Sequence, residues 1–294
     1  MATELTEEHI DNMLPERPED GHKGTFGHLF IVATSRGFTG AGKLAAEAAG
    51  RSGVGLVTVG VPASLADVVA TGLYEAMSLA LPNTESDTLS HHAIEPALNF
   101  AKGKGAVALG MGISTQEDTR TFVRTFVAGC PVPLLIDADG LNCLAEAPSI
   151  IAAAPGPVVI TPHPGEMARL AGCETTDVQR EREGIALKFA EEHECVVVLK
   201  GRDTVIAAPD GRAFIIPTGN AGLATGGTGD VLSGLMGGLM AQGIDVFDAA
   251  CIGAFAHGAA GDFAAEIATE RGLIARDVID ALPDVWGAFE EGRY

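Results

Sequence analysis

The chain has 294 residues and a mass of 30.1 kDa, the size of one large α/β domain or of two average domains. Hydrophobic residues make up 47% and charged residues 20%, so the chain can bury a large core, which excludes an intrinsically disordered protein. The net charge of −20 and pI near 4.6 argue against a nucleic-acid partner, because phosphates would be repelled. This charge fits either a salty cytoplasm or an ordinary acidic bacterial enzyme, and the sequence leaves both open.

Other features concern the cellular compartment. The five cysteines form no CxxC pair, which favours buried, reduced thiols over a disulfide framework or a zinc site. The first 20 residues are acidic and lack the regions of a signal peptide, and no run of 18 apolar residues occurs. We therefore expect a cytoplasmic protein with no membrane partner.

Short apolar runs alternate with segments of helical character along the first 200 residues. Because these runs are apolar throughout rather than alternating, they predict strands of a mainly parallel sheet that is covered on both faces. Helices are expected between them, for example over 177–193, where an apolar stripe lies amid charged residues. The predicted strands cover residues 28–34, 56–61, 76–81, 106–110, 133–138, 157–161 and 195–200.

The pattern changes after residue 200. Residues 203–218 predict a hairpin that turns at Pro209-Asp210-Gly211, and the rest of the chain predicts helices. No low-complexity linker divides the chain. We expect one α/β domain with helices packed at its C-terminal end.

A glycine-rich loop, Asn220-Ala-Gly-Leu-Ala-Thr-Gly-Gly-Thr-Gly-Asp230, precedes the apolar segment VLSGLMGGLM. Free N–H groups at a helix N-terminus bind anions, and glycine permits close backbone approach. Asp230 at the helix start is either an ordinary cap or a base that takes a proton from an acceptor hydroxyl during phosphoryl transfer. The segment does not match the Walker A pattern.

Two further motifs follow predicted strands. In Thr161-Pro-His-Pro-Gly-Glu166, the two prolines stiffen the turn that displays His163, and Glu166 is either a ligand of a metal-bound water or a first-turn helix carboxylate. In Lys200-Gly-Arg-Asp-Thr204, Lys200 is either a phosphate contact or a surface lysine.

Three more segments follow strands in the same way. Asp137-Ala-Asp-Gly-Leu-Asn142 carries two carboxylates and an amide that would organise Mg²⁺ waters or form a solvated turn. Gly37–Lys43 and Gly110-Met-Gly112 are candidates for close approach of a ligand to the backbone. Because ligands of open α/β sheets bind at the carboxyl ends of the strands, we expect all five strand-end motifs to meet at one edge.

Together these motifs resemble a known family. HKGTFGHLFIVATS, FTGAGKLAAEAAGRSGVGLVTVGVP, DADGLN, TPHPGEMARLAG, VVLKGRDTVIAAPDGR and NAGLATGGTGDVLSGLMGGLMAQG are similar to segments of the ADP- or ATP-dependent NAD(P)H-hydrate dehydratases, which have a ribokinase-like fold. The resemblance runs from about Gly21 to Trp286. It implies an N-terminal extension over residues 1–20 and a single ribokinase-like, three-layer α/β/α domain over residues 21–294. TPHPGE together with GGTGD distinguishes this family within the wider superfamily.

The resemblance implies a lyase activity that repairs (S)-NADHX and (S)-NADPHX, in which water has added to the nicotinamide ring. ADP or ATP phosphorylates the ring hydroxyl, and departure of phosphate restores NADH or NADPH. By position, the resemblance implies that Asp230 is the base and that the anion hole comprises Gly227, Thr228 and Gly229. The implied contacts to the hydrate are Ala41, Gly112, His163 and Asp230, and those to the nucleotide are Lys200, Gly201, Arg202, Asp203, Thr204 and Gly229. The implied contacts to Mg²⁺, through water, are Glu166 and Asp139.

Two positions depart from the family pattern without removing a group with a chemical role. Phe38-Thr39 stands where many members carry a tyrosine, and Asn220-Ala221-Gly222 replaces Asn-Pro-Gly. The resemblance also implies Mg²⁺ as cofactor, a homotetramer, and a functional link to a separate NAD(P)HX epimerase.

Two alternatives remain: a small-molecule kinase of the same superfamily, such as a hydroxyethylthiazole kinase, and a non-catalytic nucleotide sensor. In the dehydratase interpretation the substrate, the nucleotide and the protein are all anionic. We therefore expect loop amides, helix N-termini, Lys200 and Mg²⁺ to make the pocket locally positive, with most carboxylates on the outer helices.

Overall fold

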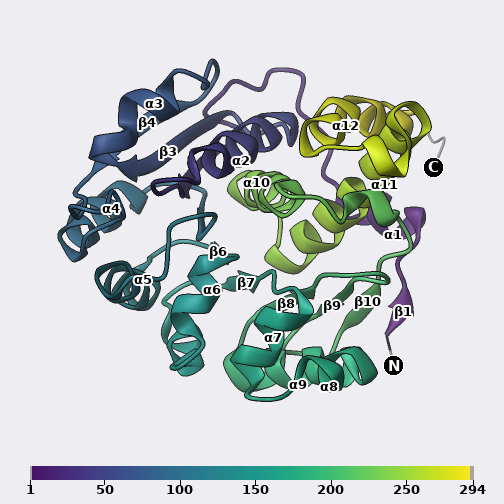
Figure 1. The fold of residues 1–294 in the computed structure, drawn as a ribbon. Coiled ribbons are helices and arrows are strands. Elements are labelled where there is room, and N and C mark those ends of the chain that lie inside the picture. The colour runs from purple at the N-terminus through teal and green to yellow at the C-terminus, as the bar shows by residue number, and fades with distance from the viewer. Residues whose placement is uncertain (1, 292–294) are drawn as a thin grey trace.

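Residues 2–291, which the computed structural model describes, build a ten-stranded sheet between two layers of helices (Figure 1). The strand order is β1-β10-β9-β8-β7-β6-β5-β2-β3-β4, and the strands from β8 to β4 in this order are all parallel. The strands are β1 (Thr3–Glu4), β2 (His28–Val32), β3 (Leu56–Pro62), β4 (Met77–Leu81), β5 (Ala106–Leu109), β6 (Leu134–Ile136), β7 (Val158–Ile160), β8 (Val196–Leu199), β9 (Val205–Ala207) and β10 (Ala213–Ile215).

Each central strand is buried on both faces, as its apolar sequence predicts. In β2, Leu29 and Ile31 enter one hydrophobic cluster, while Phe30 and Val32 enter the other. One layer of helices comprises α2 (Thr39–Arg51), α3 (Ala66–Ala70), α10 (Thr228–Ala241), α11 (Val246–Gly272) and α12 (Ala275–Glu290). The other comprises α4 (Ile94–Ala101), α5 (Glu117–Gly129), α6 (Asp139–Leu144), α7 (Pro164–Ala171), α8 (Thr175–Arg180) and α9 (Arg182–His193). The three-layer α/β/α architecture is thereby confirmed.

The hairpin expected over residues 203–218 is also confirmed. β9 pairs antiparallel with both β8 and β10. The turn closes through a hydrogen bond from the Ala208 N–H to the Arg212 carbonyl, and Gly211 adopts a positive φ of 89° there. Because this hairpin reverses the chain direction, its turn lies at the sheet edge opposite to the carboxyl ends of the parallel strands.

The first residues of the chain pack onto the sheet. β1 pairs in parallel with β10, and the helix α1 (Glu7–Met13) follows it. Leu5 and Ile10 are fully buried in the cluster that also contains residues of α11. A two-residue strand has no periodicity to read, so the sequence gives no sign of this pairing.

Two predicted elements differ from the structure. The segment 76–81 is β4, an edge strand whose Met77 side chain is 45% exposed, rather than a buried strand. Apolar composition does not tell an edge strand from a central one. The single helix expected over 177–193 is broken at Glu181, which separates α8 from α9. None of the helices within residues 2–291 combines the length and apolar composition that a bilayer-spanning helix needs.

Candidate active site

Five of the sequence motifs meet at one edge of the sheet. The strands β2, β5, β6, β7 and β8 are consecutive and parallel, so their carboxyl ends lie side by side. The motifs around Gly37–Lys43, Gly110–Gly112, Asp137–Asn142, Thr161–Glu166 and Lys200–Thr204 each begin at one of these ends. This confirms the expected convergence, and the N-terminus of α10 reaches the same edge.

The glycine-rich loop ends in the first turn of α10 and presents unpaired amides there. Gly227 precedes the helix with a positive φ of 96°, a conformation that glycine adopts without strain. Among residues 2–291, no acceptor receives a hydrogen bond from the N–H groups of Thr228, Gly229 or Asp230. A helix N-terminus with three free amides is suited to bind an anion.

The Asp230 carboxylate lies in this first turn but does not cap the helix. Within the described residues 2–291 it makes no side-chain hydrogen bond, so the alternative of an ordinary cap is not supported. Burial raises the pKa of Asp230 to about 6, the nearby Asp137 carboxylate adds to the rise, and Lys200 opposes it. An unpartnered carboxylate with a raised pKa is able to accept a proton from a bound hydroxyl near neutral pH.

Buried side chains brace the loop from behind. The Thr228 hydroxyl lies 2.8 and 2.9 Å from the carbonyl oxygens of Leu223 and Thr225, which share its one proton. Nε2 of His257 on α11 lies 2.9 Å from the Thr228 carbonyl oxygen, and because a carbonyl only accepts, Nε2 carries the proton. Burial lowers the pKa of His257 to about 4, which keeps the ring neutral. Asn220 also ties the loop to α11 through the Gly261 carbonyl and Asp262, each at 2.9 Å.

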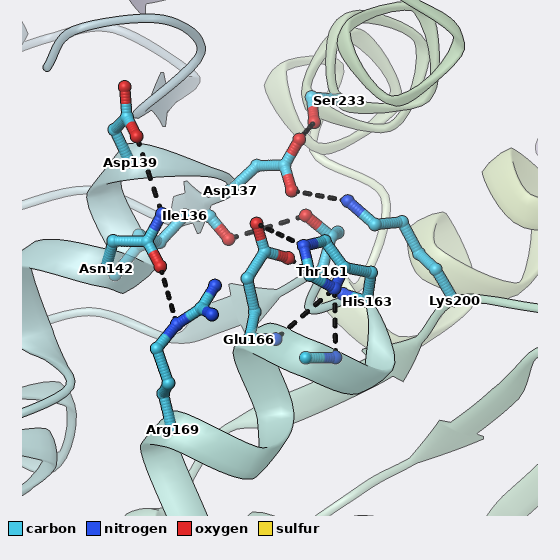
Figure 2. Close-up of polar contacts among 11 residues, drawn as sticks. Ile136, Asp137, Asp139, Asn142, Thr161, His163, Glu166, Arg169, Lys200 and Ser233 are labelled. Atoms are coloured by element: carbon cyan, nitrogen blue, oxygen red, sulfur yellow. Dashed lines mark hydrogen bonds and ion pairs between the residues drawn. The ribbon is translucent and has the colours of Figure 1, made fainter. Parts of the chain in front are cut away.

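Lys200 is directed into the site by an ion pair. Its ammonium lies 2.7 Å from Oδ1 of Asp137, and Oδ2 of the same carboxylate accepts a 2.8 Å hydrogen bond from Ser233 on α10 (Figure 2). Burial lowers the pKa of Lys200, but the carboxylates of Asp137, Glu166 and Asp230 raise it by more. Lys200 is therefore not the surface lysine of the alternative interpretation.

His163 and Glu166 form a reciprocal cap at the start of α7. The His163 N–H donates to Oε2 of Glu166 at 2.8 Å, while Nδ1 accepts from the backbone of Gly165 and Glu166 at 3.0 and 3.3 Å. Because Nδ1 accepts, the neutral ring carries its proton on Nε2. Burial, followed by Lys200 and Arg169, lowers the His163 pKa, and burial raises that of Glu166. Glu166 thus makes the contacts of a first-turn helix carboxylate, which is one of the two interpretations that its motif allowed.

The other residues of the Lys200–Thr204 segment form a compact turn. Gly201 and Asp203 adopt positive φ angles of 141° and 55°, and the Thr204 hydroxyl donates to the Gly201 carbonyl at 2.9 Å. Arg182 on α9 holds the turn from beneath with a 2.8 Å hydrogen bond to the Leu199 carbonyl. The Arg202 side chain is exposed, and its Nε lies 4.0 Å from Oδ2 of Asp203 in the same turn.

A cavity of about 610 Å³ opens beside the ends of β2, β5 and β6. Ala41 and Gly112, both expected to contact a substrate, lie together against Phe38, which lines this cavity. A Cβ on Gly112 would lie 2.7 Å from the Phe38 Cβ and 3.3 Å from that of Ala41. The remaining lining residues are polar: Ser35, Arg36, Ser86, Thr88, Ser114, Thr115, Gln116 and Asp139.

The two carboxylates expected to contact Mg²⁺ through water are only partly available. Asp139 faces the cavity, where its Oδ2 accepts a 2.9 Å hydrogen bond from the Ser114 N–H, whereas Glu166 is engaged by His163. Among residues 2–291 no group of three His, Cys, Asp or Glu side chains could hold a metal ion directly. This donor set fits an ion held mainly by nucleotide phosphates and water, with carboxylates in its outer sphere.

The fold is that of a ribokinase-like protein, with a glycine-rich loop and a carboxylate at the carboxyl ends of the parallel strands. A ribokinase-like superfamily protein from Enterococcus faecalis matches with a TM-score of 0.82 at 22% identity, covering 98% of this chain and 96% of that one, which shows the fold. A hydroxyethylthiazole kinase from Pyrococcus horikoshii matches with a TM-score of 0.60 at 15% identity, covering 94% of this chain and 91% of that one.

The family follows from the sequence comparisons. The family model for NAD(P)H-hydrate dehydratase matches residues 29–284, and this chain belongs to that family. The ADP-dependent (S)-NAD(P)H-hydrate dehydratase of Bacillus subtilis is 34% identical, over 97% of this chain and 98% of that protein. A Bacillus subtilis ADP/ATP-dependent NAD(P)H-hydrate dehydratase, co-crystallized with ATP/Mg²⁺, superposes with a TM-score of 0.83 at 32% identity, covering 98% of this chain and 99% of that one.

Other relatives are longer than this chain. The bifunctional NAD(P)H-hydrate repair enzyme of Moorella thermoacetica is 44% identical over 98% of this chain. That match covers 54% of the relative, so the chain spans about half the length of the bifunctional proteins it matches.

Sequence reasoning missed several groups that shape this site. Ser233, His257 and Arg182 carry no motif of their own, and Asp137 was noticed only as part of a strand-end cluster. A buried polar residue within an otherwise apolar helix, such as Ser233 in VLSGLMGGLM, was the available signal.

Proposed function

We propose that this protein dehydrates (S)-NADHX and (S)-NADPHX to NADH and NADPH in a reaction driven by ADP. The observation that carries the proposal is the unpartnered Asp230 carboxylate beside three free amides at the start of α10. Its place at the strand ends supports a site shared by two substrates. Asp139, whose charge helps to raise the Asp230 pKa, lines the cavity. Membership of the NAD(P)H-hydrate dehydratase family supports the choice of these substrates.

The first chemical step is transfer of the terminal phosphoryl group to the ring hydroxyl of the hydrate. Asp230 takes the hydroxyl proton while the hydroxyl oxygen attacks the phosphorus, and the bond to the leaving AMP breaks. The amides of Thr228, Gly229 and Asp230 are placed to bind the transferring oxygens. The helix dipole of α10 adds to this stabilisation of negative charge.

The second step expels phosphate. The ring nitrogen donates its electron pair as the carbon–oxygen bond breaks, and phosphate carries that bonding pair away. Loss of a proton from the neighbouring ring carbon then forms the double bond of NADH. Hydroxide is a poor leaving group at neutral pH, so prior phosphorylation is what lets this elimination proceed.

The two substrates would approach Asp230 from opposite sides. The hydrate would lie along Ala41, Gly112 and His163 and in the cavity, where Arg36 is the one basic side chain among the lining residues. The nucleotide would lie along Lys200, Gly201, Arg202, Asp203 and Thr204 and contact Gly229. Magnesium would neutralise phosphate charge, with Asp139 and Glu166 acting through bound water.

Reaction of the purified protein with (S)-NADHX and ADP tests the proposal directly. We expect 340 nm absorbance to rise as NADH forms, in amounts that match the AMP and phosphate released. The same assay with ATP compares the two nucleotides. Failure to form NADH, together with stable phosphorylation of an alcohol, would favour a plain kinase such as a hydroxyethylthiazole kinase. Nucleotide binding without any turnover would favour a sensor.

The raised pKa of Asp230 predicts the acid limb of the pH profile. The carboxylate must be ionised to accept a proton, so kcat/KM is expected to fall about tenfold per pH unit below about pH 6. Above that pH the base is ionised and this limb levels off. The residual activity of Asp230→Asn serves as the control and should show no such limb; a limb that persists in it would assign the titration to another group, such as Glu166.

The cellular compartment and the oligomeric state of the protein are part of the same proposal. We propose a cytoplasmic homotetramer in which residues 21–294 form one domain, supported by free thiols and by the exposed apolar side chains of Val68, Tyr74 and Met77 near the β4 edge. A separate epimerase would interconvert the two hydrate epimers and so supply the S form.

A further inference from the structure

The carboxylate of Asp137 links three elements at the centre of the site. It follows β6, is 2% exposed, and accepts hydrogen bonds from the Lys200 ammonium at the end of β8 and from Ser233 in α10. Ser233 lies three residues after Asp230, so both side chains project from one side of α10. Asp137 thus fixes the lysine relative to the helix that carries the base (Figure 2).

The Lys200 ammonium lies against the phosphoryl-binding loop. A Cβ built on Gly229 would lie 3.6 Å from Nζ of Lys200 and 3.8 Å from Oδ2 of Asp137. An ammonium has three N–H donors, and among residues 2–291 Asp137 Oδ1 is its one hydrogen-bond acceptor. Two donors therefore remain for a ligand bound beside Gly229.

We propose that Asp137 and Ser233 are positioning residues that hold the Lys200 ammonium beside the Gly227–Asp230 loop, where its free N–H donors bind the transferring phosphoryl group. The proposal rests on the phosphoryl-transfer function proposed above. Asp137 has a second effect: by engaging the ammonium it keeps Lys200 from pairing with Asp230, which leaves the Asp230 carboxylate free to accept a proton.

The charges of this cluster make the proposal testable without turnover. The groups that face Asp230 are the carboxylates of Asp137 and Asp139 and the ammonium of Lys200. Asp137→Asn removes a negative charge and releases the ammonium, and both changes lower the Asp230 pKa. Lys200→Met removes the positive charge and raises it.

The Asp230 pKa is measured by titrating the ¹³C-labelled aspartate carboxyl signals, with Asp230→Asn providing the assignment. We expect a fall of about one unit or more in Asp137→Asn and a rise of about one unit or more in Lys200→Met. Equal or unchanged values in both variants would overturn the proposal. Asp210→Asn, which breaks the exposed Arg212 pair at the far edge of the sheet, is the control and should leave the pKa unchanged.

Ser233→Ala separates positioning from charge. It keeps every charge of the cluster, so kcat should fall about three- to tenfold while the Asp230 pKa stays within about half a unit. A kcat equal to that of the unaltered protein would remove Ser233 from the proposal. If Asp137→Asn does not fold, Lys200→Met decides alone, since an unchanged Asp230 pKa in that variant contradicts the arrangement.

Failure of the proposed function is visible separately. Opposite pKa shifts in a protein that does not form NADH would support the positioning of Lys200 while overturning the dehydratase function. NADH formation without the pKa shifts would overturn the positioning role and leave the function in place.

Discussion

Replacing Asp230 by asparagine is expected to lower turnover of the hydrate by about 10²- to 10⁴-fold, the usual contribution of a general base. The amide cannot take the hydroxyl proton, but the loop amides and Lys200 remain in place. ADP binding, measured by calorimetry, should therefore change little. Unaltered turnover would show that another group is the base.

The same variant is expected to raise thermal stability near neutral pH. Burial raises the Asp230 pKa from its ordinary value of 3.8 to about 6, so the ionised carboxylate costs the folded state free energy at pH 7, and this cost declines progressively as pH falls between these two values. A neutral asparagine avoids the cost at every pH. A base that destabilises its own protein is typical of an active site.

Asp277→Asn is the matched control. Asp277 also lies in the first turn of a helix, α12, but its Oδ2 accepts a 2.8 Å hydrogen bond from the Ile274 N–H. We expect that variant to lower stability slightly and to leave turnover unchanged. The two substitutions would then change stability in opposite directions, and only the one at Asp230 would lower turnover.

Gly234→Ala is expected to destabilise the fold by about 1–3 kcal/mol or more. α10 packs on α2 so closely that a Cβ at Gly234 would overlap the backbone carbonyl of Ala45. Since neither helix backbone can yield cheaply, α10 must shift, and its first turn carries Asp230. Thermal unfolding should show a lower Tm, and kcat should fall as well.

Gly50→Ala is the control for this prediction. Gly50 lies in α2, and nothing lies within 4 Å of the position that its Cβ would occupy. Alanine there is expected to stabilise the helix by about 0.5–1 kcal/mol. Equal effects at both glycines would contradict the close packing of α10 on α2.

The charge of the protein is distributed partly as expected. Among residues 2–291, Asp87, Asp137 and Glu166 are the buried acidic side chains, and the others are at least partly exposed. The site itself gathers Asp137, Glu166 and Asp230 around the single ammonium of Lys200. Side chains therefore do not make the pocket positive, and the anion-binding character comes from the amides of α10 and the free donors of Lys200.

The sequence by itself determined the sheet, the family and the edge at which the chemistry lies. Uniformly apolar runs separated by helical segments specify parallel strands covered on both faces, and parallel strands place their carboxyl ends together. The motifs at those ends and the glycine–aspartate loop could be read because each is a local pattern of neighbouring residues.

Only the tertiary structure decided which groups touch. Asp137 contacts Lys200, which is 63 residues away in the sequence, and Ser233, which is 96 residues away. Strand β1, near the N-terminus, pairs with β10. Such contacts leave no local periodicity, because they depend on how strands and helices pack rather than on neighbours in sequence. Packing likewise placed β4 at an edge of the sheet, although its apolar composition was also consistent with a buried strand. Packing also left the Asp230 carboxylate without a hydrogen-bond partner in the described part of the chain, although the motif was also consistent with a helix cap.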